Sequence, residues 1–241
     1  MKIVYWSDYA CPYCYIGEAR LKKAIKELGL ELNGDCKSPK VVEIETRAFE
    51  LDPTAPKTVE TITVERFAKK YHLSKEEAQQ QIDHISQLGI NEGIDFRYAT
   101  TLYTNTRDAH RLTKLAQTKH DAALENRVSE LLFDAYFTRN EKLSDHGVLL
   151  RVARDAGLNE AETKAVLESN RFDEEVRFDE SEAMMRGVRG VPYFIFNGKF
   201  VIPGALSVRA FKHTLEKAIK EEKENVLSED AHQCGPEGCR I

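Results

Sequence analysis

The order of apolar and polar positions divides the start of the chain into three elements. Ile3-Val4-Tyr5-Trp6 is a β-branched and aromatic run, which predicts a short buried strand. Between Cys14 and Gly29 the apolar residues recur at helical spacing, and the glycine then provides a stop. Apolar and charged residues alternate over 41–49, which predicts a second strand. Strand, helix and strand in this order begin a βαβ unit.

The middle of the chain, from about 58 to 185, has helical periodicity and no convincing strand pattern. A capping box, Ser74 with Glu77 three residues later, marks the start of one helix. This stretch is too long for a loop in a compact domain, so it predicts an inserted helical subdomain. The expected helices cover 64–71, 75–91, 106–120, 122–139, 145–156, 160–168 and 171–185.

Strand character returns near the end of the chain. The run 191–196 is apolar, Asn197-Gly198 follows, and 199–202 is apolar again, which predicts a β-hairpin with a type I′ turn. Ser207 is expected to cap a last helix that continues through Ala218. Beyond it the chain becomes polar and charged.

Composition narrows the classes of function. Apolar residues make up 41% and charged residues 31%, and the formal net charge is −5, which is typical of a soluble globular protein. No Lys/Arg-rich block indicates a nucleic-acid partner, and no apolar run approaches the ~20 residues of a membrane span. The chain goes straight into a strand without a secretory leader, so we expect a cytoplasmic protein, whose cysteine pair is then catalytic or redox-sensing.

The candidate chemistry lies in Cys11-Pro12-Tyr13-Cys14, between the first strand and the first helix. A helix N-terminus offers free N–H groups and a positive dipole end, which stabilise a Cys11 thiolate. Pro12 suits the first helical position, and Cys14, one turn on, can resolve a mixed disulfide. A zinc site would need a second ligand pair, so redox chemistry is favoured and no metal site is predicted.

A second cysteine pair lies in the segment 226–241, which we expect to be a flexible tail. Gly-Pro-Glu-Gly separates Cys234 from Cys239 and can form a turn that brings the two sulfurs together. The pair is therefore a candidate second redox centre that exchanges with Cys11–Cys14. A passive disulfide or two free thiols is the alternative.

Two motifs together resemble the DsbA family of thiol-disulfide oxidoreductases. They are Cys11-Pro12-Tyr13-Cys14 after the first strand and Gly190-Val191-Pro192-Tyr193-Phe194 at the start of the hairpin. The stretches 8–17, 105–112 and 198–205 are similar to the FrnE-like branch. The resemblance implies an α/β thioredoxin-like fold with a large all-helical insertion between its β-α-β half and its C-terminal β-hairpin-α half. The implied domains are 1–57 with 186–225, and 58–185 as the insertion.

The resemblance also implies which residues act. The two cysteines are catalytic, and Pro12, Tyr13, Val191 and Pro192 contact the substrate. Pro192 is expected to be a cis-proline that faces the cysteines. Because a proline at the head of a strand leaves an edge free, Val191 can offer its backbone groups to an extended substrate.

The implied function is thiol-disulfide exchange with proteins or small thiols. It needs no cofactor, although glutathione is a candidate co-substrate. The middle pair Pro-Tyr differs from the Pro-His of periplasmic DsbA and is shared with glutaredoxins, so the net direction of the reaction stays open, as does the oligomeric state. The alternatives are a glutathione-dependent isomerase or transferase, like 2-hydroxychromene-2-carboxylate isomerases and kappa-class transferases, and a redox-sensing protein that binds clients.

Other residues are candidates for the site but also have a purely structural interpretation. Asp8 either accepts a proton from a buried thiol or caps the turn before Cys11. His110 is expected to be a satisfied histidine near a helix cap, although its segment could line the site. Cys36 is expected to be an unpaired loop thiol, and Tyr5 and Trp6 are expected to belong to the core.

Overall fold

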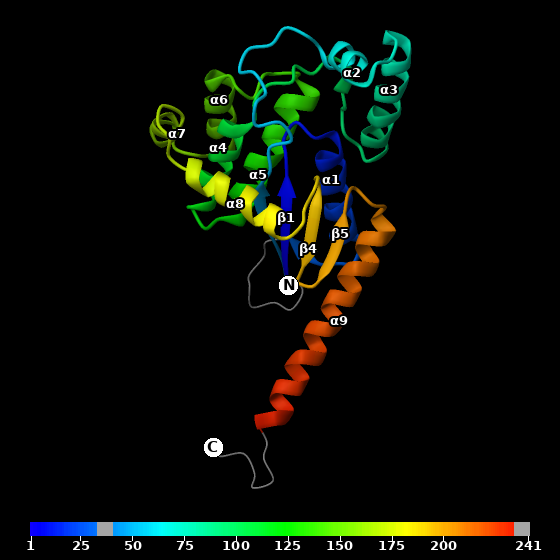
Figure 1. Cartoon of the computed structure of the whole chain (residues 1–241). Coiled ribbons are helices and arrows are strands. Elements are labelled where there is room, and N and C mark those ends of the chain that lie inside the picture. Colours follow the sequence, from blue (N-terminus) through cyan, green and yellow to red (C-terminus); the bar gives the residue numbers. More distant parts are fainter. Residues whose placement is uncertain (33–40, 234–241) are drawn as a thin grey trace.

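The computed structural model describes residues 1–32 and 41–233. Its centre is a five-stranded sheet of order β2-β3-β1-β4-β5 (Figure 1). β1 (Lys2–Ser7) pairs in parallel with β3 (Val41–Ala48) and antiparallel with β4 (Tyr193–Phe196). β2 (Glu31–Leu32) and β5 (Phe200–Pro203) form the two edges. β2 was not expected, because two residues are too short to show a pattern.

The hairpin of β4 and β5 has the expected type I′ turn. Asn197 and Gly198 have φ values of 47° and 72°, and the Lys199 N–H donates to the Phe196 carbonyl at 3.0 Å. The expectation of a free edge at Pro192 is wrong, because β4 lies between β1 and β5. The Pro192 carbonyl also accepts a hydrogen bond from the Gly204 N–H at 2.7 Å.

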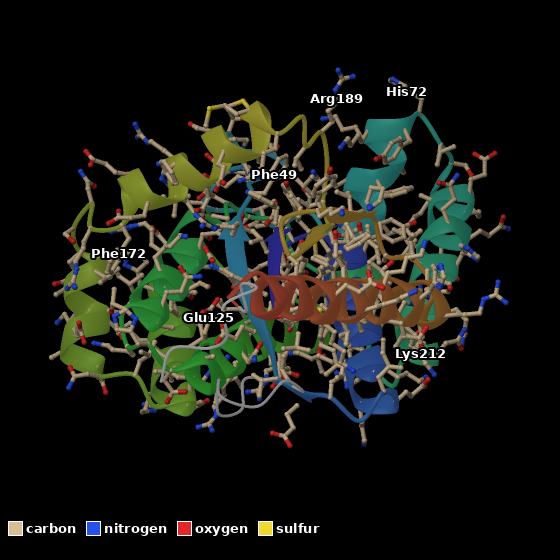
Figure 2. The ribbon with its side chains drawn as sticks, turned by 90° about the horizontal axis from the view of Figure 1, so that it is seen from below. Phe49, His72, Glu125, Phe172, Arg189 and Lys212 are labelled. Atoms are coloured by element: carbon tan, nitrogen blue, oxygen red, sulfur yellow. The ribbon has the colours of Figure 1, made fainter. Side chains whose placement is uncertain are left out.

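One face of the sheet is covered by α1 (Pro12–Glu27) and α9 (Val208–Gln233). Figure 2 shows α9 in front of the sheet, with Lys212 on its outer side, where Lys212 Nζ lies 3.1 Å from Glu27 Oε2 of α1. Both helices turn apolar residues toward β1, β3 and β4, which buries a continuous cluster. Its fully or nearly buried members are Ile3, Tyr5, Leu21, Ala24, Ile25, Val42, Ile44, Phe194, Phe196, Ile202, Phe211, Leu215 and Ala218.

The opposite face is covered by α8 (Asp173–Met185), which was expected within the insertion. The Trp6 indole N–H donates to the Asp179 carbonyl oxygen at 3.0 Å. The Asp179 carboxylate accepts hydrogen bonds from Arg47 Nη1 at 2.9 Å and the Ala48 N–H at 2.8 Å, and it pairs with Lys114. A buried carboxylate therefore joins α8 to β3 and to a helix of the insertion.

Helices fill the segment between β3 and β4, as the periodicity predicts. Figure 2 shows α2 and α3 on one side of the molecule and the other helices between β3 and β4 on the opposite side. The capping box of α3 is formed, with the Glu77 N–H donating to Ser74 Oγ at 3.1 Å. The helix expected over 122–139 changes to π geometry at Asp134. The elements are α2 (Thr63–Tyr71), α3 (Lys75–Asn91), the 3₁₀-helix η1 (Tyr98–Thr100), α4 (Arg107–Gln117), α5 (Ala122–Phe133), the π-helix η2 (Asp134–Thr138), α6 (His146–Ala156) and α7 (Glu160–Leu167).

The last helix is longer than expected. Ser207 caps it, with Oγ accepting from the Ala210 N–H at 3.3 Å, but α9 continues past Ala218 to Gln233. The apolar periodicity ends near Ile219, whereas the following residues are polar and charged, and Lys220 and Glu224 form an i,i+4 pair at 3.8 Å that favours helix there. The tail expected over 226–241 therefore begins inside this helix. Cys36, Cys234 and Cys239 lie outside the described residues.

None of the helices in the described ranges is long and apolar enough to cross a membrane.

Candidate active site

The two cysteines lie where β1 gives way to α1. Cys11 is the N-cap residue of α1 with extended backbone, and Pro12 occupies the first helical position, as the sequence predicts. The Cys14 N–H donates to the Cys11 carbonyl at 3.1 Å. Cys11 is 4% exposed and Cys14 is fully buried, and both are free thiols. Cys11 is therefore the sulfur that a substrate reaches first.

A second loop faces Cys11 from the start of β4. The Val191–Pro192 peptide bond is cis, and the Cys11 thiol donates to the Val191 carbonyl oxygen, with an Sγ to O distance of 3.5 Å. In the part of the chain that the structure describes, the Val191 N–H has no backbone acceptor. α1 packs tightly on this loop, because a Cβ at Gly17 would lie 3.1 Å from Pro192 Cγ. A larger residue at position 17 would force Pro192 or the helix to shift by a few tenths of an ångström, so glycine suits this close approach.

Two hydroxyl groups lie behind Cys14, and neither was expected there. The Tyr5 hydroxyl donates to the Cys14 carbonyl at 3.0 Å, and its pKa is raised, chiefly by burial. Ser7 follows on the same face of β1, and its buried Oγ has no hydrogen-bond partner among the described residues. Burial raises the pKa of the Cys14 thiol, as does hydrogen bonding with Cys11, and the Asp8 N–H acts in the opposite direction. Cys14 is thus a protonated thiol in the resting protein.

Asp8 connects the cysteine loop to the end of β3. Its carboxylate accepts the Ala10 N–H at 3.1 Å and the Leu51 N–H at 2.7 Å, and its carbonyl accepts the Cys11 N–H at 3.0 Å. Both carboxylate oxygens are therefore engaged by backbone donors. Of the two interpretations of Asp8, these contacts support capping of the turn.

His110 contacts this loop from α4. The side chain is 2% exposed, and its ring lies 5.0 Å from the ring of Tyr9. Its Nε2 lies 3.8 Å from Asp8 Oδ1 and has no hydrogen-bond partner within the described ranges. We expected the ring nitrogens of His110 to have hydrogen-bond partners, and this is wrong for Nε2. The ring packs against Tyr9 in a position that leaves Nε2 too far from Asp8 for a hydrogen bond.

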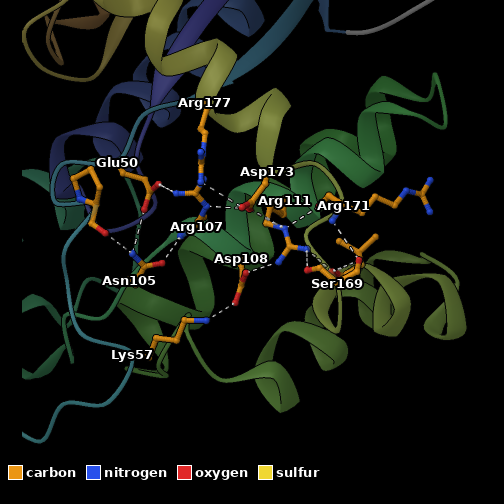
Figure 3. Close-up of polar contacts among 12 residues, drawn as sticks. Glu50, Lys57, Asn105, Arg107, Asp108, Arg111, Ser169, Arg171, Asp173 and Arg177 are labelled. Atoms are coloured by element: carbon orange, nitrogen blue, oxygen red, sulfur yellow. Dashed lines mark hydrogen bonds and ion pairs between the residues drawn. The ribbon is translucent and has the colours of Figure 1, made fainter.

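The segment around Asn105 supports the site from behind (Figure 3). Asn105 Nδ2 donates to Glu50 Oε2 at 3.2 Å, and Arg107 bonds Glu50 Oε1 at 3.5 Å and Asp173 Oδ1 at 3.0 Å. The pKa of Glu50 is raised, chiefly by burial. These contacts hold the loop after β3 to α4 and α8. The Asn105–Leu112 stretch therefore positions the site and does not line its cavity.

A cavity of about 750 Å³ opens over Cys11. Cys11, Pro12, Tyr13 and Val191 form one wall of it, and Tyr13 is 41% exposed at the rim. The other walls come from the loop after β3, from α2 and α3, and from the segment around η1. These residues are Ala10, Leu51, Asp52, Arg66, Phe67, Lys70, Tyr71, Gln81, Ile85, Tyr98 and Tyr103. The sequence pattern predicts the first wall but not the others, because distant helices assemble them.

The cysteines do not form part of a cluster of metal ligands. Among residues 1–32 and 41–233, no group of three or more His, Cys, Asp or Glu side chains is placed to hold a metal ion. The arrangement instead suits exchange chemistry, with an accessible sulfur and a second sulfur buried one helical turn away.

Comparisons with known proteins agree with this geometry. The chain is 27% identical over 223 residues to the uncharacterized protein YwbO of Bacillus subtilis, with 90% of this chain and 95% of YwbO covered. The crystal structure of the probable DsbA oxidoreductase SCO1869 from Streptomyces coelicolor superposes with a TM-score of 0.80 and 29% identity, and covers 100% of this chain and 99% of that one. A 2-hydroxychromene-2-carboxylate isomerase shares the fold at a TM-score of 0.63 and 16% identity, over 95% and 98% of the chains.

The family model of the DSBA-like thioredoxin domain matches residues 2–216, which is most of the chain. That range contains both cysteines of the motif, the whole helical insertion and the cis-proline loop. This protein therefore belongs to the family of DSBA-like thioredoxin domains.

Proposed function

We propose that this protein is a thiol-disulfide oxidoreductase that exchanges disulfides with proteins or small thiols through Cys11 and Cys14. The observation that carries the proposal is the position of Cys11. Its Sγ lies at a helix N-terminus, in the wall of a cavity of about 750 Å³ and 3.5 Å from the Val191 carbonyl oxygen. Cys14 lies one turn further along the same helix.

The chemistry follows from these positions. The Cys11 thiolate attacks one sulfur of a substrate disulfide, the substrate S–S bond breaks, and the leaving thiolate takes a proton from solvent. Cys14 then loses its proton, attacks Cys11 Sγ, and releases the second substrate thiolate. The Cys11–Cys14 disulfide forms, and two electrons have passed to the substrate. The same steps in reverse oxidise a dithiol.

The test separates this function from its two rivals. We expect the wild-type protein to turn over a disulfide peptide many times with a thiol reductant, and Cys14→Ser to accumulate a mixed disulfide between Cys11 and the peptide. Mass spectrometry under non-reducing conditions measures that adduct. Isomerisation of a chromene carboxylate that survives in Cys14→Ser would favour the glutathione-dependent isomerase. Binding of the peptide without any turnover would favour the redox-sensing protein.

The raised pKa of Cys14 predicts a pH dependence of the resolving step. Burial is its largest cause and persists in the mixed disulfide, so Cys14 stays a thiol near neutral pH. Only the thiolate attacks, and its fraction grows about tenfold per pH unit below the pKa. The single-turnover rate of peptide release is therefore expected to rise about tenfold per unit between pH 7 and 8.5. A release rate that does not change with pH would show that Cys14 is already ionised. The release rate measured in Cys14→Ser is the background to be subtracted.

We also propose that the protein works in the cytoplasm, where small thiols keep most cysteines reduced. Glutathione would then be a co-substrate that returns the Cys11–Cys14 disulfide to the dithiol. Acid quenching of cells followed by thiol alkylation measures the redox state of the pair. A pair that is mostly reduced, and becomes oxidised when glutathione is depleted, is the expected result.

A further inference from the structure

Two cations of α2 face the cavity that contains Cys11. Arg66 and Lys70 lie one helical turn apart and both contribute to the cavity wall. Within the described ranges neither of them makes an ion pair, and the neighbouring Glu65 is engaged by Lys75 at 3.9 Å. By contrast, Arg47, Arg107 and Arg111, on β3 and α4, each pair with a carboxylate. The two cations that line the cavity therefore have no protein counter-ion among the described residues.

The Arg66 side chain is held in place by an aromatic ring. Its Cζ lies 3.5 Å from the ring centre of Tyr103, which also lines the cavity. Stacking uses the flat face of the guanidinium and leaves its N–H donors, which lie in the plane, available for an anion. Lys70 Nζ lies 5.5 Å from the ring centre of Tyr71. Both cations are thus positioned by aromatic contacts that satisfy none of their hydrogen-bond donors.

The side chains other than Cys11 that line the cavity carry more positive than negative charge. Asp52 is the carboxylate among its described lining residues, and its Oδ1 already accepts hydrogen bonds from the Thr54 N–H at 3.1 Å and the Thr54 hydroxyl at 2.7 Å. The Cys11 thiolate and Arg66 also act on one common group. Burial raises the pKa of Tyr98, the Cys11 charge raises it further, and Arg66 lowers it. Arg66 and the reacting sulfur therefore share one partly enclosed space.

We propose that Arg66, assisted by Lys70, forms an anion subsite that selects disulfides bearing a carboxylate near the reacting sulfur. This inference rests on the proposed function and names the substrate class of the same site. A carboxylate matches the forked donors of a guanidinium. It would hold the substrate in the cavity while its disulfide faces Cys11. A cationic disulfide would meet repulsion at the same position.

The test uses three disulfides of similar size that differ in charge. They are 3,3′-dithiodipropionate, which is anionic, bis(2-hydroxyethyl) disulfide, which is neutral, and cystamine, which is cationic. Each kcat/KM is divided by the rate constant for reduction of the same disulfide by dithiothreitol, which removes differences in intrinsic reactivity. The wild-type protein is expected to prefer the anionic over the neutral disulfide by roughly tenfold. This preference should shrink in 0.5 M salt, because screening weakens charge pairing.

The variants assign the preference to Arg66. Arg66→Gln is expected to lose most of it, because its kcat/KM should fall much further for the anionic than for the neutral disulfide, and Arg66→Glu is expected to prefer cystamine. Lys70→Gln should show a smaller loss. Lys69→Gln is the matched control, because Lys69 lies on the same helix, is exposed and does not line the cavity. Thermal unfolding midpoints identify any variant that is not folded, and Lys70→Gln and the salt series then still test the proposal.

Two results would overturn the proposal. Equal normalised rates for the three disulfides in the wild-type protein would show that the cavity does not select charge. If Arg66→Gln keeps the preference for the anionic disulfide but unfolds at a lower temperature, the contact between Arg66 and Tyr103 contributes to stability only. The anion subsite would then be refuted. A wild-type protein that reduces none of the three disulfides would instead overturn the proposed function itself, so the two failures are distinguishable.

Discussion

Replacement of Cys11 with serine is expected to lower disulfide reduction by at least about a thousandfold, to the background rate. Cys11 is the accessible sulfur of the pair, whereas Cys14 is fully buried and cannot attack an external disulfide. A hydroxyl is a poor nucleophile at neutral pH, and no other thiol lines the cavity among the described residues. Multiple-turnover reduction of a disulfide peptide measures the effect.

The fold should survive this change. A serine hydroxyl can still donate to the Val191 carbonyl that Cys11 Sγ contacts at 3.5 Å, so the free energy of unfolding should change by less than about 1 kcal/mol. Cys36→Ser is the matched control for loss of a thiol and should retain full activity. Full turnover in Cys11→Ser would refute thiol-disulfide exchange through this motif.

Replacement of Asp179 with alanine is expected to lower the free energy of unfolding by about 3–5 kcal/mol. The Asp179 carboxylate is 1% exposed and pairs with both Arg47 and Lys114. Its loss leaves the nearly buried Lys114 without its ion-pair partner and beside Arg47, which keeps Glu45 and Glu182, and it removes the acceptor of the Ala48 N–H. Urea unfolding followed by circular dichroism measures the change.

The control for Asp179 is an exposed carboxylate in a helix. Asp83 of α3 accepts one hydrogen bond from Gln79 in solvent, so Asp83→Ala should cost less than about 0.5 kcal/mol. A loss for Asp179→Ala as small as that of the control would mean that the Asp179 carboxylate contributes little to holding α8 on the sheet. The cluster of Trp6, Ala183, Val188 and Ile195 would then be the main attachment.

Local patterns predict most of the elements and the position of the cysteine motif at the start of α1. The strand before Cys11, the position of Pro12 and the Asn197-Gly198 turn depend on neighbours in the sequence, so the sequence predicts them well. The helical insertion follows from its period. β2 was missed because it has two residues, and the end of α9 was misplaced because charge pairs extend a helix without adding apolar periodicity.

The cavity could not be predicted in the same way. Arg66 and Tyr103 are separated by more than thirty residues, and their contact exists only because α2 and the segment after η1 pack together. His110 Nε2 lies 3.8 Å from Asp8 Oδ1, a few tenths of an ångström beyond hydrogen-bond distance, and no spacing in the sequence encodes such a difference. The sequence therefore predicts where the cysteine motif lies but not the charged side chains that line the cavity beside it.

The direction of α9 decides whether its C-terminal end meets Cys11 within one molecule or between two molecules. The helix has 26 residues, so it spans about 39 Å. Figure 1 shows that it runs from the hairpin to the end of the molecule opposite the turn that follows β1. A cross-linker attached at position 233, the last residue of α9, would therefore meet Cys11 of another molecule more readily than Cys11 of its own. With α9 intact, the yield of such a cross-link would increase with protein concentration.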